Sequence, residues 1–299
     1  MEKEVSNNQW QELIALHLEK AKNPLLVLLG PTASGKTAFS LEVAKWIVQS
    51  SGHRVMVSPS NHGTYASPFD ELRVTRTEII NADSRQLYKY MDVGTAKITA
   101  EEMGGIPHHL FSVLDPKEKV TAGWYKQEAE EAISAILARG NVPILVGGSM
   151  LYISAVTDGY VFTGRGGKCK SPIPYDLLIL GMRWPREELV KRIEERTKKL
   201  LGLLPPSPAA AGEGTGERAK VMDWLQEVEW LLANGYTASD PGMESCGYRE
   251  IAAWILNGKK EEEFPQIIES INAATRQYAK RQCTWWRHDK RIQWISFSL

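Results

Sequence analysis

Short apolar runs alternate with amphipathic stretches along most of this chain. Five runs are continuous enough to be buried strands of a parallel sheet, and they cover residues 25–29, 77–82, 142–146, 175–182 and 292–297. Apolar residues at helical spacing predict helices over 7–20, 37–49, 124–138, 185–200, 221–233, 248–256 and 264–281. This order predicts an α/β protein with a mostly parallel sheet flanked by helices and a helical C-terminal part.

The loop after the first apolar run is the most specific motif. Residues 30–37 read GPTASGKT and fit G-x-x-x-x-G-K-[ST], between a predicted strand and a predicted helix. In such a loop the backbone N–H groups turn inward, and the helix N-terminus adds partial positive charge. Lys36 supplies a point charge, and the Thr37 hydroxyl can bind Mg²⁺ or an oxyanion. The motif therefore predicts a P-loop NTPase-like core that holds a di- or triphosphate.

Composition narrows the class of protein. Lys plus Arg and Asp plus Glu each number 36, so any nucleic-acid surface must be local. No apolar run approaches about 18 residues, and the polar N-terminus does not resemble a signal peptide, so we expect no membrane span. The three cysteines are far apart and form no C-x-x-C pair. This argues against a zinc site or a disulfide framework and fits a reducing cytoplasm.

We expect residues 1–23 to form an N-terminal helix or arm and residues 24–299 to form one core. Turn-forming residues predict loop insertions at 50–77, where we expect a strand at 53–57, and at 203–218. Neighbouring His108 and His109 are not spaced for a shared metal, so we expect them to hydrogen-bond at a strand start.

Two more strand ends carry candidate chemistry. Asp83 follows the strand at 77–82, where ligands of open α/β sheets bind, although it could instead cap a helix that begins at Ser84. A second glycine turn, Gly147-Gly148-Ser149, follows the strand at 142–146 and is expected near the first loop. Ser149 could equally be a simple helix cap.

Two predicted helices carry basic residues whose role has two alternative interpretations. Arg192 and Arg196 are four residues apart on the helix at 185–200, so they share a face that meets either a phosphate or solvent. Basic residues between 276 and 291 are interleaved with Trp285 and Trp286. This pattern is typical of RNA contacts, or of a solvated cationic helix with two core tryptophans.

Taken together, the motifs resemble those of the tRNA dimethylallyltransferases, also called tRNA isopentenyltransferases. The matching segments are GPTASGKT at 30–37, INADSRQLYKYMDVGTAK at 80–97, GIPHHLFSVLDP at 105–116, PILVGGSMLYI at 143–153, CGYREI at 246–251 and ATRQYAKRQCTWWR at 274–287. They keep the family's order over most of the chain. One departure is large: residues 163–174 are a short replacement of the helical insertion that grips the anticodon arm in the family.

The resemblance implies transfer of a dimethylallyl group from dimethylallyl diphosphate to N6 of the adenosine 3′-adjacent to the anticodon of tRNA. Asp83 would accept the amine proton, and Ser149 and Thr37 would complete the catalytic set. Thr37 would also hold Mg²⁺. The implied diphosphate-binding residues are Gly30, Thr32, Ala33, Ser34, Gly35, Lys36, Thr37 and Arg196, with Arg192 as the alternative arginine.

The implied tRNA-binding residues are Asp83, Ser84, Arg85, Gln86, Gly247, Tyr248, Arg249, Lys280, Arg281, Gln282, Trp285 and Arg287. We expect a cytoplasmic monomer that binds the tRNA anticodon loop and dimethylallyl diphosphate. Because the insertion is short, transfer to free AMP, ADP or ATP is a second hypothesis. A small-molecule kinase and an RNA-binding relative without turnover are further alternatives, since both share the phosphate loop.

Overall fold

The central sheet of the computed structural model is parallel throughout. The model describes residues 3–5, 9–52, 76–163, 167–204 and 222–297, and within them seven strands form one sheet. The sheet order is β1 (Lys3–Val5), β9 (Ile292–Ser296), β8 (Asp176–Arg183), β2 (Pro24–Leu29), β5 (Val142–Gly147), β3 (Thr77–Ala82) and β4 (His108–His109). The expected strand at 53–57, and residues 205–218 of the loop expected at 203–218, lie outside the described residues.

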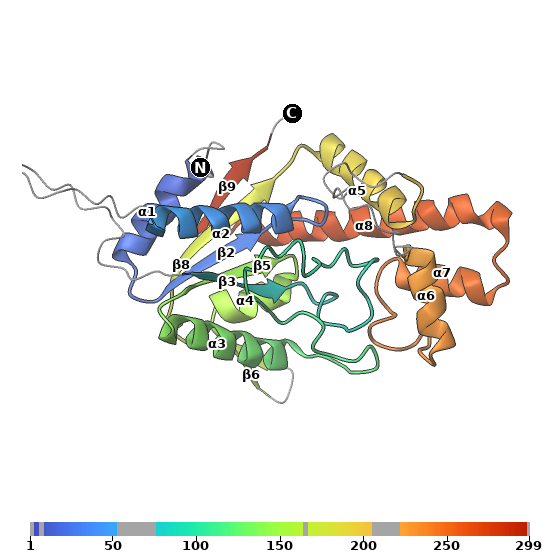
Figure 1. Cartoon of the computed structure of the whole chain (residues 1–299), viewed down its shortest axis with the longest axis horizontal. Coiled ribbons are helices and arrows are strands. Elements are labelled where there is room, and N and C mark those ends of the chain that lie inside the picture. Colours follow the sequence, from blue (N-terminus) through green and yellow to red (C-terminus); the bar gives the residue numbers. More distant parts are fainter. Residues whose placement is uncertain (1–2, 6–8, 53–75, 164–166, 205–221, 298–299) are drawn as a thin grey trace, which may run out of the picture.

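Helices cover both faces of the sheet (Figure 1). They are α1 (Trp10–Lys20), α2 (Lys36–Gly52), α3 (Ala122–Ala138), α4 (Met150–Thr157), α5 (Arg186–Leu200), α6 (Trp224–Ala233), α7 (Tyr248–Leu256) and α8 (Phe264–Trp286), with a 3₁₀ turn at Glu261–Glu263. The prediction of a parallel α/β core with a helical C-terminal part is confirmed. None of the described helices is long and apolar enough to cross a membrane.

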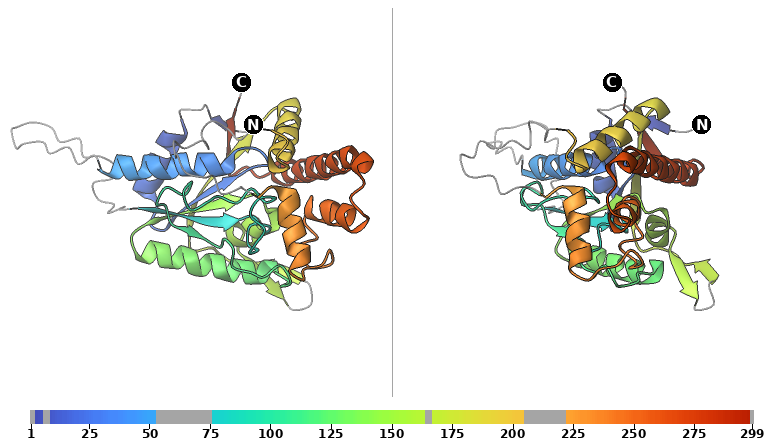
Figure 2. Two further views of the ribbon diagram at one scale, coloured as in Figure 1. Left: turned by 45° about the vertical axis from the view of Figure 1, so that its right-hand side comes forward. Right: turned by 90° about the vertical axis from the view of Figure 1, so that its right-hand side faces the viewer.

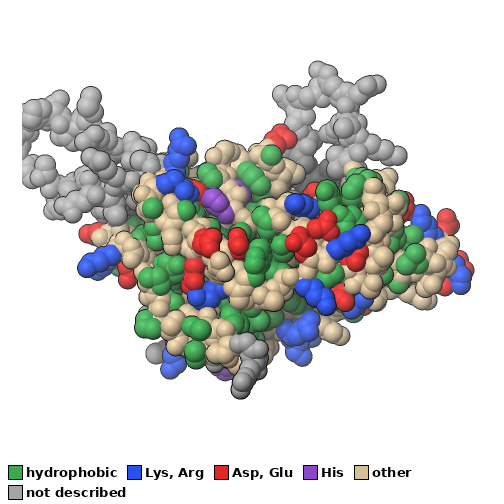
Figure 3. Space-filling view, turned by 90° about the horizontal axis from the view of Figure 1, so that it is seen from below, with side chains coloured by type: hydrophobic (Ala, Val, Ile, Leu, Met, Phe, Trp, Pro, Cys, Tyr) green, Lys and Arg blue, Asp and Glu red, His purple; other side chains and the backbone are tan. Residues whose placement is uncertain are grey.

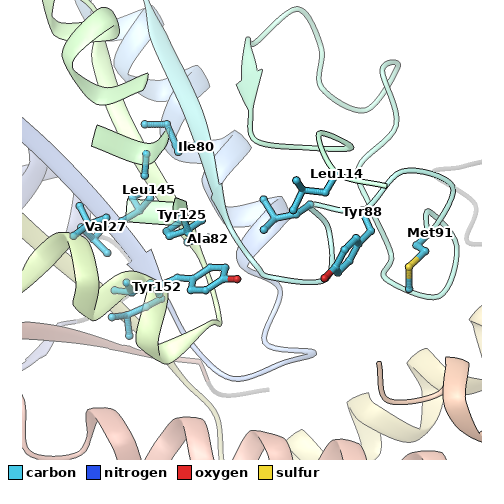
Figure 4. Close-up of a cluster of buried hydrophobic side chains, with 14 of the residues drawn as sticks. Val27, Ile80, Ala82, Tyr88, Met91, Leu114, Tyr125, Leu145 and Tyr152 are labelled. Carbon is cyan, nitrogen blue, oxygen red and sulfur yellow. The ribbon is translucent and has the colours of Figure 1, made fainter. Parts of the chain in front are cut away.

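Strand β2 is apolar at every position because both of its faces are buried. Leu26 and Leu28 pack beneath α1 and α2, whereas Leu25, Val27 and Leu29 pack beneath α3 and α4. A strand buried on both faces needs apolar side chains in both directions. Figure 4 shows the second of these layers, where Val27, Ile80 and Leu145 lie against stacked aromatic rings of the helices.

The N-terminal residues belong to the core. β1 pairs in parallel with β9, and Trp10 of α1 packs edge-on against Phe39 of α2 with ring centroids 5.4 Å apart. Trp10, Ile14 and Leu18 are buried at helical spacing. The described part of the region predicted as a helix or arm is therefore a sheet strand followed by a packed helix.

Between α4 and β8 the chain forms an antiparallel hairpin of β6 (Tyr160–Thr163) and β7 (Gly167–Lys170). This hairpin occupies the position at which the sequence analysis notes a short segment in place of a helical insertion. Figure 2 shows it standing away from the body of the molecule. The exposed Val161 and Phe162 side chains fit that position.

A buried carboxylate attaches the C-terminal helices to the loop after β3. Glu227 of α6 is 3% exposed and accepts hydrogen bonds from the backbone N–H groups of Asp92 and Val93 at 2.7 Å and of Gly94 at 3.0 Å. Tyr248 of α7 donates its hydroxyl to the same carboxylate. Three backbone donors and one hydroxyl compensate for burying the charge.

A second buried carboxylate, Glu78, joins β3 to its neighbours. It accepts from His109 at 2.6 Å, from Asn141 at 2.7 Å and from Arg139 at 2.9 Å. The expected hydrogen-bonding role of His109 is confirmed. Burial would raise the pKa of Glu78, but the hydrogen bonds from Arg139, Asn141 and His109 outweigh it and lower the pKa to about 2.

Glu78→Gln should lower the free energy of unfolding by about 2 kcal/mol at neutral pH, because charge-assisted hydrogen bonds are lost. The pKa of Glu78 is lowered on folding, so its contribution is complete above the ordinary value of 4.5 and is lost as the pH falls toward about 2. Urea unfolding of both proteins between neutral and acidic pH measures the difference. A difference that stays constant over that window would contradict the assignment.

Candidate functional site

The ends of three neighbouring strands lie at one level of the sheet. Leu29 of β2 and Ala82 of β3 are both register partners of Gly147 of β5. The residues that follow therefore emerge side by side: the phosphate loop (residues 30–37) after β2, Asp83 after β3, and the turn at 147–149 after β5. The predicted convergence of these three segments follows from sheet register alone.

The phosphate loop is held from outside by side chains that follow β8. Trp184 donates its indole N–H to the Ser34 carbonyl at 2.9 Å, and Arg192 donates Nε to the Ala33 carbonyl at 2.9 Å. The Arg192 guanidinium stacks over Trp184 at 4.1 Å. Gly35 has φ +90°, which glycine adopts without strain. These contacts fix the loop with α2 beginning at Lys36.

A cavity of about 470 Å³ opens on this loop, and we call it the phosphate-loop cavity. Its loop-side lining is Thr32, Ala33, Gly35, Lys36 and Thr37, with Arg192 and Arg196 from α5. Asp83, Ile79 and Phe111 line other parts of it. Gly30 and Ser34, which the sequence analysis also assigns to diphosphate binding, are buried and do not line the cavity.

Lys36 lies within this positive environment. Its Nζ donates to the Pro31 carbonyl at 2.8 Å. Burial lowers the pKa of Lys36 to about 8, the negative charge of Asp83 partly opposes that shift, and Arg196 adds to it. An anion in the cavity would favour the protonated amine. The cavity therefore suits a diphosphate.

Arg196 spans the site more fully than Arg192. It donates NH1 to the Thr32 hydroxyl at 2.7 Å and NH2 to the Thr95 carbonyl at 3.0 Å. Burial lowers its pKa, and Asp83 counteracts that effect. The side chain thus joins α5, the phosphate loop and the loop after β3. Both arginines border the phosphate-loop cavity, so the face they share meets the site rather than open solvent.

Asp83 begins a turn, not a helix. Its backbone N–H donates to Asn81 Oδ1 at 2.8 Å, and its Oδ1 accepts from the Arg85 N–H at 2.9 Å. Residues 84–87 form turns, so the alternative that Asp83 caps a helix at Ser84 is wrong. The side chain is half-buried and lines two cavities.

Ser149 supports this turn. It stands at the N-cap of α4, but its Oγ does not bond to that helix and instead accepts from the Ser84 N–H at 2.8 Å. Its own N–H donates to the Ala82 carbonyl at 3.0 Å. Ser149 is 6% exposed and lines neither cavity. In this structure it positions the Asp83–Ser84 backbone, which differs from the predicted contact with substrate.

The second cavity, also of about 470 Å³, lies beyond Arg196, and we call it the arginine cavity. It shares Thr32, Asp83, Thr95, Arg196 and Leu200 with the phosphate-loop cavity. Its remaining wall includes Arg85, Arg249 and Arg281, which are exposed cations.

The arginine cavity gathers about half of the residues predicted to contact RNA. These are Asp83, Ser84, Arg85, Tyr248, Arg249 and Arg281. Gln86 instead donates to the carbonyls of Thr95 and Ala96 and lines the phosphate-loop cavity. Gly247 is a buried helix cap whose N–H donates to Glu250 at 2.6 Å.

Burial limits how several residues of the predicted RNA-binding set could contact RNA. Tyr248 is only 1% exposed and its hydroxyl is bound to Glu227, so its side chain offers RNA no surface. Gln282 is also 1% exposed. Lys280 on α8 and Arg287, which directly follows α8, are exposed, and Trp285 is 46% exposed with its indole N–H on Ser154 at 3.2 Å. Of the two tryptophans, Trp286 alone is a core residue.

Three tyrosines that the sequence did not single out, Tyr125, Tyr152 and Tyr278, lie close enough to Asp83 for its charge to contribute to their raised pKa values. Burial raises the pKa of Tyr278 to about 12, and the hydroxyl lies 3.4 Å from the Gly148 carbonyl. Burial also raises the pKa of Tyr152, which stacks on Tyr125 at 4.1 Å. The hydroxyl ends of Tyr152 and Tyr88 point toward one another (Figure 4). All four hydroxyls therefore remain protonated donors near neutral pH.

The distribution of charged side chains differs between the α3 face of the molecule and α8. Figure 3 views the face that carries α3, and there acidic and basic side chains are interspersed. By contrast, α8 and the residues after it carry Lys280, Arg281, Arg287 and Lys290, and none of these has an ion-pair partner within the described residues. A local basic surface thus lies along this helix.

The site fits a magnesium ion bound mainly through its substrate. Thr37 is exposed in the phosphate-loop cavity, and Asp83 lines the same space. Among the described side chains, no group of three or more His, Cys, Asp or Glu could hold a metal ion. Mg²⁺ commonly uses one or two protein ligands together with substrate phosphates and water, which such a donor set allows.

Comparison with known proteins identifies the family. A family model described as IPP transferase matches residues 86–169 and 217–289. The chain belongs to this family. It is 32% identical to tRNA dimethylallyltransferase 1 of Syntrophotalea carbinolica, over 91% of this chain and 90% of that protein. It is 31% identical to tRNA dimethylallyltransferase of Geobacter metallireducens, over 93% and 94% of the two chains.

Solved structures agree with this assignment. The crystal structure of the full-length tRNA isopentenylpyrophosphate transferase from Bacillus halodurans superposes with a TM-score of 0.68 at 25% identity. The match covers 92% of this chain and 90% of that one. The transferase from Staphylococcus epidermidis gives 0.66 at 26% identity, covering 91% and 93%. The IPP transferase family thus accounts for nearly the whole described fold.

Proposed function

We propose that this member of the IPP transferase family transfers the dimethylallyl group of dimethylallyl diphosphate to N6 of the adenosine 3′-adjacent to the anticodon of a tRNA. One observation carries the proposal: Asp83 stands where a cavity for a diphosphate meets a second cavity lined by exposed arginines. The names of the relatives support the donor and the tRNA acceptor. A tRNA substrate is consistent with the expected cytoplasmic site of action.

The phosphate-loop cavity supplies the groups that a leaving diphosphate requires. As the allylic C–O bond breaks, its electron pair stays on diphosphate, and negative charge grows there. Lys36, Arg192, Arg196 and the N-terminus of α2 surround that position. Mg²⁺ held by Thr37 would add Lewis-acid stabilisation to the same oxygens. Fixed charges that need no rearrangement favour the ionised donor over the intact ester.

The acceptor reaches the allylic carbon from the arginine cavity. An extruded adenine would place its exocyclic amine near Asp83, and the nitrogen lone pair would form the new C–N bond. Asp83 then accepts the proton that the amine loses, which balances the charge of the leaving diphosphate. Ser149 holds this turn through the Ser84 N–H, so the carboxylate keeps its position.

An acceptor assay tests this function. The protein is incubated with Mg²⁺, radiolabelled dimethylallyl diphosphate and either tRNA or AMP. We expect label in tRNA, and nuclease digestion should locate it on the adenosine beside the anticodon. Label in AMP alone would contradict the proposal in favour of an adenylate isopentenyltransferase. Phosphoryl transfer from ATP without prenyl transfer would indicate a kinase.

Replacing Lys280 and Arg281 with glutamine should weaken tRNA binding and flatten its salt dependence. Each lost phosphate contact should reduce the slope of log K against log salt by roughly 0.7. Filter binding at several salt concentrations measures the slope. The matched control replaces exposed Lys20 and Lys45 on α1 and α2. An equal effect of both pairs would show that the α8 surface is not the RNA site.

A further inference from the structure

Gln282 connects the two glycine-containing loops of the site. Its Oε1 accepts from the Thr32 N–H of the phosphate loop at 2.8 Å, and its Nε2 donates to the Gly148 carbonyl at 2.7 Å. Only a side chain with a donor and an acceptor on one carbon can make both bonds in this arrangement. The two partners also fix the orientation of the amide, because a backbone N–H requires oxygen and a carbonyl requires N–H.

The surrounding packing leaves this amide no other role. Gln282 is 1% exposed, so its side chain cannot reach RNA on the surface of α8. A Cβ atom at Gly148 would lie 2.4 Å from Gln282 Nε2, so only glycine lets the amide approach this closely. The sequence pattern groups Gln282 with its exposed neighbours Lys280 and Arg281, but helix geometry turns it toward the interior.

Each of the two hydrogen bonds of Gln282 leads to residues that make further hydrogen bonds at the cavities. Thr32 also accepts from Arg196, which continues to the Thr95 carbonyl. On the other side, Gly148 precedes Ser149, whose hydroxyl holds the turn that carries Asp83. The amide is thus placed between the loop that would hold diphosphate and the turn that would hold the base.

We propose that Gln282 is a positioning residue that sets the spacing between the phosphate loop and the Asp83–Ser149 turn, and hence between the donor and the acceptor amine. This rests on the function proposed above. Gln282 touches neither cavity and acts through Thr32 and Gly148. It also fixes α8, which carries Tyr278 and Arg281 of the arginine cavity, to the donor loop.

Gln282→Met keeps the length of the side chain but removes both hydrogen bonds. We expect kcat/KM for dimethylallyl diphosphate to fall by about 100-fold, because small misplacements of reacting groups have effects of that order. The affinity for inorganic pyrophosphate with Mg²⁺, measured by calorimetry, should fall by about tenfold as the loop loses preorganisation. The dissociation constant for tRNA should change less than twofold. Thr284→Ala, an exposed position outside both cavities on α8, is the matched control.

Gln282→Glu should make kcat/KM depend on pH in a way that a purely structural role of Gln282 would not. A protonated carboxyl can accept from Thr32 and donate to Gly148, whereas an ionised one repels the Gly148 carbonyl. Neighbouring titratable or charged groups are Tyr278, Cys283, Arg183, Arg287, Lys36, Arg196 and Asp83. kcat/KM of this variant relative to wild type should therefore fall about tenfold per pH unit once the pH exceeds the pKa of the introduced carboxyl.

The outcomes separate this inference from the proposed function. A wild-type protein that does not prenylate tRNA would contradict the function, while the pyrophosphate affinities would still report on Gln282. If the Met variant does not fold by thermal melting, the pH profile of the Glu variant decides. Wild-type kinetics in both variants would overturn the inference. A defect confined to tRNA affinity would show that Gln282 contacts RNA.

Discussion

Asp83→Asn should reduce the turnover of tRNA prenylation by about 10²- to 10⁴-fold, the range associated with loss of a general acid–base group. The amide keeps an oxygen that can accept from the Arg85 N–H, so the turn is preserved. It cannot accept the proton that the adenine amine loses. We therefore expect kcat to carry most of the effect, with KM for both substrates nearly unchanged. Steady-state kinetics with saturating tRNA and Mg²⁺ measures it.

Asp115→Asn is the matched control for that variant. Asp115 makes the same kind of turn, since its Oδ1 accepts from the Lys117 N–H at 3.0 Å, but it lines neither cavity. Its turnover should remain close to wild type. Near-normal turnover of the Asp83 variant, or equal losses in the two variants, would remove Asp83 from the mechanism.

Lys36→Met should lower kcat/KM for dimethylallyl diphosphate by about 100-fold or more, as seen when preorganised stabilisation of a developing anion is lost. The substitution removes one of the fixed cations of the phosphate-loop cavity and leaves Arg192 and Arg196. Part of the loss should appear as weaker pyrophosphate binding and part as lower kcat, because charge on the leaving group grows in the transition state.

Lys45→Met, two turns further along the exposed side of α2, controls for loss of a lysine from the same helix. Its donor kinetics should match the wild type. If Lys36→Met binds pyrophosphate and turns over normally, then the leaving group does not lie on the phosphate loop, and the assignment of the cavity is wrong.

Much of the fold follows from sequence because local patterns and sheet register agree. The apolar runs placed five of the strands to within about two residues, and the order of strands and helices gave the parallel architecture. β1 was not predicted, and β4 was expected only as a strand start at His108 and His109 and not from an apolar run. They contain three and two residues, too short for a pattern, and they exist only because β9 and β3 offer an edge to pair with.

The sequence predicted those parts of the site whose positions depend on backbone geometry. Strand register brings together the phosphate loop, Asp83 and the second glycine turn, so motifs at strand ends sufficed to locate them. The direction of individual side chains could not be predicted from the sequence. Tyr248 and Gln282 are polar residues in basic segments, yet tertiary packing buries both and gives them partners in other elements. A buried side chain of that kind leaves no periodic signal.

The sequence also could not predict which side chains bind backbone carbonyl groups. Arg196 binds the Thr95 carbonyl, and Trp184 binds the Ser34 carbonyl. Every residue carries such a carbonyl, so no residue type marks the partner. A glycine or a carboxylate can be read from the chain, whereas the position of a particular C=O requires the fold.

The account depends on a donor in the phosphate-loop cavity whose reactive carbon faces Asp83 and the arginine cavity. A crystal structure with Mg²⁺ and a donor analogue that carries sulfur in place of the ester oxygen tests this directly. We expect diphosphate oxygens on the backbone N–H groups of residues 33–37, with Lys36 and Arg196 beside them. We expect the allylic carbon on the Asp83 side. A diphosphate bound in the arginine cavity, against Arg249 and Arg281, would contradict it.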